Sequence, residues 1–224
     1  MRQVNRKVKA NRKMLILPAF LLMIIAVGGI VVYYWYANTY FVSTDDASIQ
    51  GDLVKATPQI SGKLLEIDVK DGQSVQKSQI IARVDMGALP DINMDSSVVR
   101  APISGIVLKK QGTIGEIVSP GQPLAIMVDP SALYITANIE ETKLKNIRLG
   151  QNVDVTIDQY DGVRFIGKVD TIGDYANSAL AVIPTSTSGT FTKVVQKVPV
   201  KISLAKTNYK VLPGTNVIVK IHIK

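Results

Sequence analysis

One stretch occurs twice in this sequence, and the duplication constrains the fold more than any other feature. Residues 54–85 and 97–128 align at a single offset of 43 positions without a gap. Within that alignment, Ile-Ser-Gly at 60–62 corresponds to Ile-Ser-Gly at 103–105. A repeat of this kind is a duplicated supersecondary unit, and one copy alone cannot bury its apolar face. The two copies are therefore expected to pack against each other.

Each copy has the pattern of short strands joined by tight turns. In the first copy, Leu65, Ile67 and Val69 alternate with polar residues. Alternating runs broken by Ser-Gly, Asp-Gly and Pro-Gly are typical of strands and turns. We predict a small β-sandwich over residues 54–129, with structural turn glycines at Gly62, Gly72, Gly105 and Gly121.

The N-terminal region predicts a membrane anchor. Residues 14–36 carry no charge, and as a helix they would be about 34 Å long, enough to cross a bilayer. Six basic residues precede them in 1–13, which predicts a cytoplasmic N-terminal tail and an extracytoplasmic remainder. A cleaved signal peptide is the alternative. It would have a shorter apolar region and a small residue near the cleavage site, where this chain has Trp35, so an uncleaved single-pass anchor is favoured.

The composition excludes several classes of function. The net charge is +8, but the basic tail supplies six of these charges, so no nucleic-acid-binding face is expected. There is no cysteine for a disulfide or thiolate metal site. His222 is the single histidine, lies in a C-terminal strand pattern and is expected to face solvent, which makes a poor metal site. No phosphate-binding or nucleophile motif occurs, so we expect no enzyme, cofactor or metal.

The C-terminal region, residues 130–224, predicts a second β domain. Apolar residues alternate with polar ones around 133–139, 153–157 and 198–204, and again at 217–223. Evenly spaced short strands of this kind predict a small closed barrel or sandwich. A short helix is expected over 140–147. The Ser/Thr/Gly-rich stretch 174–190 predicts a loop, either mobile or facing a transporter.

The order and spacing of several short motifs resemble those of HlyD/EmrA-like membrane fusion proteins, the adaptor subunits of export pumps. The paired halves are similar to a lipoyl/biotinyl-type domain. The other residues that carry the resemblance are Thr44, Asp45, Asp46 and Ala47, then APISGIV at 101–107, ETK at 141–143, LGQ at 149–151 and KVVQKVPV at 193–200.

This resemblance implies a mostly β chain with an N-terminal transmembrane helix, a lipoyl-like sandwich and a small β-barrel. It implies that segment 37–53 is a linker in which residues 44–49 add a strand to the barrel. The partners implied are the membrane, an inner-membrane transporter of the major-facilitator or ABC type, and further copies of the chain.

Two features depart from the family pattern. Ser78 stands where relatives have glycine, and because glycine readily adopts positive φ, this turn is expected to differ slightly. The linker 86–96 is too short for the α-helical hairpin of most relatives, since helices below about 12 residues are marginal. Even fully extended in both directions it would reach less than about 20 Å, so contact with an outer-membrane channel is not expected.

The neighbouring carboxylates Asp45 and Asp46 could be read as an acid/base or metal pair. Adjacent residues of a strand point to opposite faces, so the two would not converge on one ligand. A solvated turn or the start of a strand is the favoured interpretation.

Three hypotheses about function follow. The first is a non-enzymatic adaptor beside a transporter. The second is a membrane-anchored biotinyl or lipoyl carrier, which needs a lysine between the halves, and linker 86–96 has none. The third is an anchored Ser–Lys protease similar to type I signal peptidases, whose Ser-Met-x-Pro motif is absent.

Overall fold

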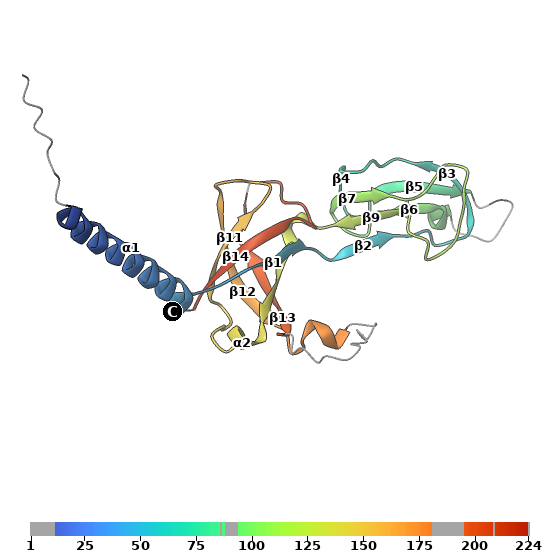
Figure 1. Ribbon diagram of the computed structural model, residues 1–224. Coiled ribbons are helices and arrows are strands. Elements are labelled where there is room, and N and C mark those ends of the chain that lie inside the picture. Colours follow the sequence, from blue (N-terminus) through green and yellow to red (C-terminus); the bar gives the residue numbers. More distant parts are fainter. Residues whose placement is uncertain (1–11, 86, 88–93, 181–194, 208, 224) are drawn as a thin grey trace, which may run out of the picture.

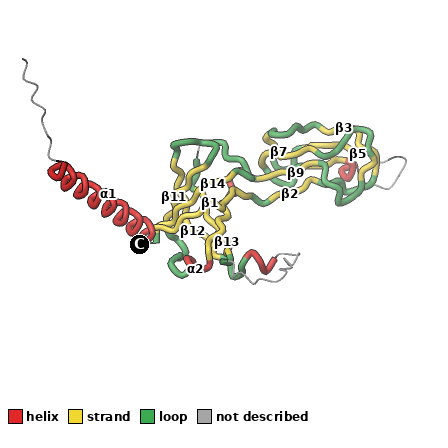
Figure 2. Tube along the Cα trace, in the orientation of Figure 1, coloured by secondary structure: helices red, strands yellow, loops and turns green. Residues whose placement is uncertain are grey.

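The computed structural model describes residues 12–85, 87, 94–180, 195–207 and 209–223 (Figure 1). It shows an N-terminal helix, a closed β-barrel and a β-sandwich, so the mostly β fold is confirmed. The helix and the sandwich extend from opposite sides of the barrel, as Figure 2 shows by secondary structure. Most of the predicted tail 1–13 and of the linker 86–96 lies outside the described residues.

Helix α1 (Arg12–Tyr40) is longer than the apolar segment that predicted it. Its part from Phe20 to Tyr40 is long and apolar enough to cross a membrane, and the rest of the described chain leaves it uncovered. The aromatic residues near its end are exposed, Tyr34 by 69% and Trp35 by 64%.

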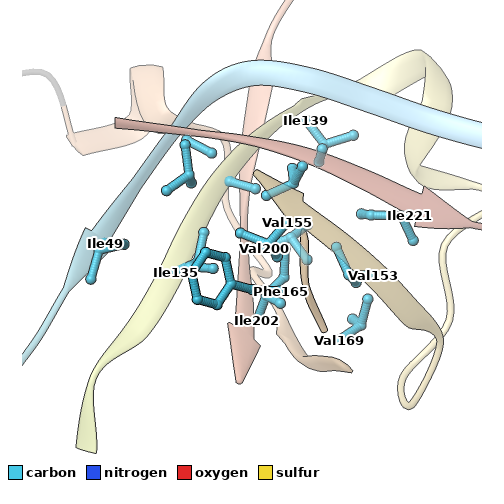
Figure 3. Close-up of a cluster of buried hydrophobic side chains, with 14 of the residues drawn as sticks. Ile49, Ile135, Ile139, Val153, Val155, Phe165, Val169, Val200, Ile202 and Ile221 are labelled. Atoms are coloured by element: carbon cyan, nitrogen blue, oxygen red, sulfur yellow. The ribbon is translucent and has the colours of Figure 1, made fainter. Parts of the chain in front are cut away.

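The barrel has six antiparallel strands in the closed order β1-β10-β13-β12-β11-β14. These are β1 (Phe41–Gln50), β10 (Tyr134–Glu140), β11 (Asn152–Ile157), β12 (Arg164–Ile172), β13 (Lys197–Leu204) and β14 (Asn216–His222). Strand β1 precedes the sandwich in sequence, yet it pairs with both β10 and β14 and closes the barrel. The interior is apolar and includes Ile49, Ile135, Val155, Val200, Ile202 and Ile221 (Figure 3).

Short helical segments connect the barrel strands. Helix α2 (Glu141–Leu144) occupies only the first part of the helix expected over 140–147. The 3-10 turns η2 (Pro130–Ala132) and η3 (Asn177–Leu180) precede β10 and follow β12, respectively.

Strand β12 was not anticipated from the sequence. Its inward residues are Phe165, Gly167 and Val169, while Ile166 is 62% exposed. The glycine is required because a methyl group there would lie 2.8 Å from the Ile202 side chain. A glycine facing inward and an isoleucine facing outward hide the alternation that marks the other strands.

The sandwich consists of two four-stranded sheets, β2-β9-β7-β4 and β6-β5-β3-β8. The first copy supplies β2 (Leu53–Ala56), β3 (Gly62–Ile67), β4 (Ser74–Val75) and β5 (Ile80–Asp85). The second supplies β6 (Val98–Arg100), β7 (Gly105–Lys110), β8 (Ile117–Val118) and β9 (Ala125–Val128), after the 3-10 turn η1 (Met94–Ser97). Exchanging the two copies converts one sheet into the other.

Each copy completes the other through backbone hydrogen bonds. The N–H of Gly72 donates to the carbonyl of Val107 at 2.7 Å. At the matching positions, the N–H of Gly115 donates to the carbonyl of Leu64 at 2.8 Å. Because turns of each copy are held by backbone groups of the other copy, the expectation that the copies pack as one unit is met in the backbone itself.

The four glycines predicted at turns occupy two kinds of position. Gly72 and Gly121 have φ of +80° and +89°, the left-handed region that turns of this type need. Gly62 and Gly105 instead begin β3 and β7 and have no positive φ. There a methyl group would overlap the carbonyl oxygen at the end of the paired strand, so glycine is required for close approach.

Ser78 does not change its turn, so the expected difference was wrong. Its φ of +68° is the left-handed conformation that Gly121 adopts in the second copy. The N–H of Ser78 donates to the carbonyl of Ala101 at 2.8 Å, and the N–H of Lys77 donates to Oγ of Ser104 at 2.9 Å. These bonds from the second copy hold the serine in a conformation that costs about 1–2 kcal/mol.

Candidate functional site

The family motif at 44–47 forms a β-bulge in the middle of β1. Thr44 pairs with Val219 and Ala47 with Val217, so Asp45 and Asp46 together stand opposite one residue of β14. The two aspartates are solvated as expected, but their placement at a turn or a strand start was wrong. The motif lies within a ten-residue strand.

The bulge allows both ends of β1 to face the barrel core. Val42 is buried before the bulge, and Ala47 and Ile49 are buried after it. With regular alternation, a strand that buries Val42 would turn Ala47 and Ile49 outward. Burying an isoleucine contributes about 1.5–3 kcal/mol, so the extra residue keeps this strand in the closed barrel.

Polar contacts tie the bulge to two further barrel strands. Thr44 Oγ1 accepts from the N–H of Asp46 at 3.1 Å and donates to the carbonyl of Asn138 at 3.2 Å. Asp46 accepts from Asn138 Nδ2 at 3.0 Å and from Lys197 Nζ at 2.8 Å. Strands β1, β10 and β13 are thus joined at one point.

Electrostatics at the bulge follow from these contacts. The hydrogen bond from Lys197, followed by that from Asn138, holds the pKa of Asp46 below its ordinary value. The hydrogen bond to Asp46 raises the pKa of Lys197. The two side chains are 43% and 46% exposed, so solvent screens the pair and its effect on stability is small.

The two carboxylates at the bulge have different surroundings. Asp45 is exposed, whereas Asp46 is engaged by amide and ammonium donors. Within the described ranges, no three His, Asp or Glu side chains are grouped so that they could hold a metal ion. The arrangement is suited to shaping a surface rather than to chemistry.

A contact extends from the bulge to the segment that was predicted as a loop. Asn177 in η3 donates through Nδ2 to Oδ1 of Asn138 at 2.8 Å. Nearby, Tyr175 is 47% exposed and lines a cleft with Tyr134 and Lys201, whose ammonium lies 3.9 Å from the Tyr134 ring centre. Residues 181–190 of the predicted loop lie outside the described part of the chain.

His222 is paired rather than facing solvent alone, which corrects the sequence interpretation. Its Nε2 lies 2.9 Å from Oδ2 of Asp154, and its ring meets the edge of Phe41 at a centroid distance of 4.9 Å. The side chain is 38% exposed. Phe41, Asp154 and His222 meet only because β1, β11 and β14 lie side by side in the barrel. No local sequence pattern predicts these contacts.

Two family models match the chain. The model described as "RND MFP, barrel-sandwich hybrid domain" matches residues 52–130. The model described as "YknX-like beta-barrel domain" matches residues 133–221. The two matches cover the sandwich and the barrel in turn.

Relatives cover the chain to different extents. The putative efflux system component YhbJ of Bacillus subtilis (strain 168) is 38% identical over 216 residues, which is 95% of each chain. The probable multidrug resistance protein EmrK of Escherichia coli (strain K12) is 30% identical over 131 residues, or 58% of this chain and 34% of EmrK. The solved structure of the periplasmic adaptor protein EmrA has a TM-score of 0.58 at 16% identity and covers 82% of this chain and 98% of that one, which shows a shared fold.

The closed barrel, the duplicated sandwich and the two matched models together define the domain architecture of a membrane fusion protein. The chain belongs to the membrane fusion proteins, in the EmrA-like group that its motifs resemble.

Proposed function

We propose that this chain is a non-enzymatic, membrane-anchored adaptor subunit of an export pump. It packs on the extracytoplasmic side of an inner-membrane transporter, of the major-facilitator or ABC type, and acts as several copies. Tail 1–13 is cytoplasmic, helix segment 14–36 crosses the membrane, and residues 37–224 are extracytoplasmic. The names of the relatives support an efflux role, since YhbJ is named as a putative efflux system component and EmrK as a probable multidrug resistance protein.

The observation that carries the proposal is the direct connection between the anchor and the barrel. Helix α1 ends at Tyr40, and β1 begins at Phe41 with no linker between them. Because β1 is hydrogen-bonded on both sides, to β10 and to β14, the barrel is held at the membrane surface. A transporter's extracytoplasmic surface lies at the same level.

The division of labour among the domains follows from this placement. The barrel, with its bulge at Thr44–Asp45–Asp46–Ala47 and the cleft beside Tyr175, is the part proposed to meet the transporter. The sandwich at 54–129 stands beyond the barrel (Figure 1) and is the part proposed to meet neighbouring copies. With only the short linker 86–96 between its halves, the chain does not reach an outer-membrane channel by itself.

The carrier hypothesis has less support. The sandwich has the paired halves of a lipoyl-type domain, but linker 86–96 offers no lysine for biotin or lipoate. The matched models and relatives are those of membrane fusion and efflux proteins.

Topology reporters test the anchoring and orientation on which the proposal depends. A reporter that is active only outside the cytoplasm, fused after Lys224, should be active, and a cytoplasm-specific reporter at the same site should be silent. The same two reporters fused after Arg12 should give the opposite pattern. A cytoplasmic signal after Lys224 would overturn the adaptor role.

A further inference from the structure

The junction between α1 and the barrel contains a cleft of about 590 Å³, large enough for a small polar ligand. From α1 and the start of β1 it is lined by Trp35, Asn38, Thr39 and Phe41, among others. From α2 and β14 it is lined by Lys143 and Lys220, respectively. Residues from the anchor and from three barrel elements therefore converge on one space.

The depth of this cleft in a membrane follows from the helix geometry. Trp35 and its tyrosine neighbours are exposed aromatic residues of the kind that lie at a membrane–water interface. Thr39 is one helical turn further on, about 6 Å along the axis. The polar layer on each side of a bilayer is about 5–8 Å thick, so the cleft lies at the depth of the lipid headgroups.

The charge of the cleft is positive. A second cleft also contains Asn38 and Thr39 and adds Lys145 and Arg148. Neither cleft is lined by an aspartate or a glutamate. Four cationic side chains therefore surround the end of the anchor.

Two of the carboxylates near this cleft, those of Glu140 and Asp154, are already paired with basic side chains. Glu140 pairs with Lys143 at 3.1 Å, and the exposed Glu141 begins the same helix. Asp154, opposite Lys220 on β11, is held by His222. Within the described chain, no ion pair joins a carboxylate to the other three cations, Lys145, Arg148 and Lys220.

We propose that this cleft binds the phosphate of an anionic phospholipid in the leaflet where α1 ends. The lysines attract the phosphate, since an ammonium group binds phosphate as a point charge. The amide and hydroxyl of Asn38 and Thr39 offer hydrogen-bond donors. Trp35 and Phe41 cover the apolar part of the lipid, and Lys220 is held 5.1 Å from the Phe41 ring centre. The bound lipid would fix the angle between the anchor and the barrel; this inference rests on the membrane anchoring proposed above.

Trp35 is the only tryptophan in the chain and therefore reports on its own lipid neighbours. The full chain is reconstituted in bilayer discs that contain phosphatidylglycerol and phosphatidylcholine, with bromine on the acyl chains of one lipid at a time. Quenching of Trp35 then gives the relative association constant of the two lipids. We expect a preference of at least fivefold for phosphatidylglycerol, because one basic residue at an anionic surface changes affinity by about fivefold.

Paired variants make the test specific. Lys143→Gln with Lys220→Gln should reduce the preference to about onefold to twofold, whereas Lys143→Arg should retain it. Lys206→Gln with Lys210→Gln is the matched control, because these lysines line a cleft at the sandwich end of the same barrel. The control should keep the full preference despite the same loss of charge.

The quenching results distinguish a failure of the lipid site from a failure of the membrane anchor. Equal quenching by both lipids in the unmodified chain would overturn the lipid site and leave the anchor in place. An absence of quenching by either lipid would instead contradict the anchoring. Loss of the preference in millimolar inorganic phosphate would assign the cleft to free phosphate and overturn the lipid proposal.

Discussion

Ser78 adopts the same left-handed backbone conformation as Gly121, its counterpart 43 residues further along, with φ of +68° against +89°. The duplication therefore preserves the turn even where glycine is missing. The two copies hold each other's turns through backbone bonds, and the bond from Ser78 N–H to Ala101 is one of them. Packing between the copies offsets the local strain at this serine.

Replacing Ser78 by glycine should stabilise the sandwich. The left-handed conformation costs a non-glycine residue about 1–2 kcal/mol, and glycine avoids this cost. Glycine in turn lowers the stability of the folded state by about 0.5–1 kcal/mol, because it gives the unfolded chain more conformational freedom. We expect Ser78→Gly to raise the free energy of unfolding by about 0.5–1 kcal/mol in denaturant titrations. Ser78→Ala keeps the strain and is the control, with little change expected. A Ser78→Gly protein less stable than the original would contradict the account of this turn.

Neutralising Asp46 should weaken the barrel in a pH-dependent way. Because the pKa of Asp46 is lowered in the folded protein, its contribution to stability is complete above about pH 4 and is lost as the pH falls through the lowered pKa. The raised pKa of Lys197 means that its contribution is complete below about pH 10 and is lost as the pH rises further.

The pH range over which Asp46 contributes to stability is measured by comparing the melting temperatures of Asp46→Asn and the unmodified chain. At pH 7 the variant should melt lower by no more than a few degrees, since the pair is exposed. As the pH falls through the lowered pKa of Asp46, the two curves should converge. Asp45→Asn is the matched control, because Asp45 is exposed and affects Lys197 only through a weaker charge–charge attraction, not through the hydrogen bonds that Asp46 makes. A difference that grows toward low pH would contradict the assigned role of Asp46.

Removing β1 should open the barrel. A fragment of residues 38–224 keeps this strand, whereas a fragment of 53–224 leaves β10 and β14 without their shared neighbour. Exposed strand edges promote association. In size-exclusion chromatography we expect the shorter fragment to form larger species and to melt earlier. Identical behaviour of the two fragments would show that β1 is dispensable for the barrel.

The carrier hypothesis has a direct test by mass. The intact protein, purified from its own host, should show no increment for biotin or lipoate, because linker 86–96 has no lysine. A biotinyl or lipoyl increment on any lysine between residues 54 and 128 would restore the carrier hypothesis. Protein expressed without the host's ligases is the control for the unmodified mass.

The sequence predicts those parts of the fold whose contacts leave a repeated or alternating pattern of residues. The sandwich is predictable because its contacts repeat at one offset, and four barrel strands, β10, β11, β13 and β14, show plain alternation of apolar and polar residues. Strand β12 does not show this alternation, because Gly167 faces the core and Ile166 faces outward. Their placement depends on side chains of neighbouring strands. The bulge at Asp45 and Asp46 depends on cross-strand register, which no local pattern contains.

The candidate site was predictable only in part, for the same reason. Motif residues 44–47 stand out by resemblance, yet their partners Asn138 and Lys197 come from strands far along the chain. The pairing of His222 with Asp154 likewise needs three strands side by side. Side chains that meet only across strands of a closed barrel have no fixed separation in the sequence, so no motif predicts that they will be in contact.

Photo-crosslinking in native membranes shows whether the barrel meets a transporter. Benzoylphenylalanine replaces Tyr175, an exposed aromatic residue in the cleft beside η3, and in a matched variant replaces Ile117, which is 77% exposed on the sandwich. With the full chain at its native level, the Tyr175 position should capture a protein with many membrane-spanning helices, and the Ile117 position should not. Capture at Tyr175 of only further copies of this chain, or of a soluble enzyme subunit, would contradict the adaptor function.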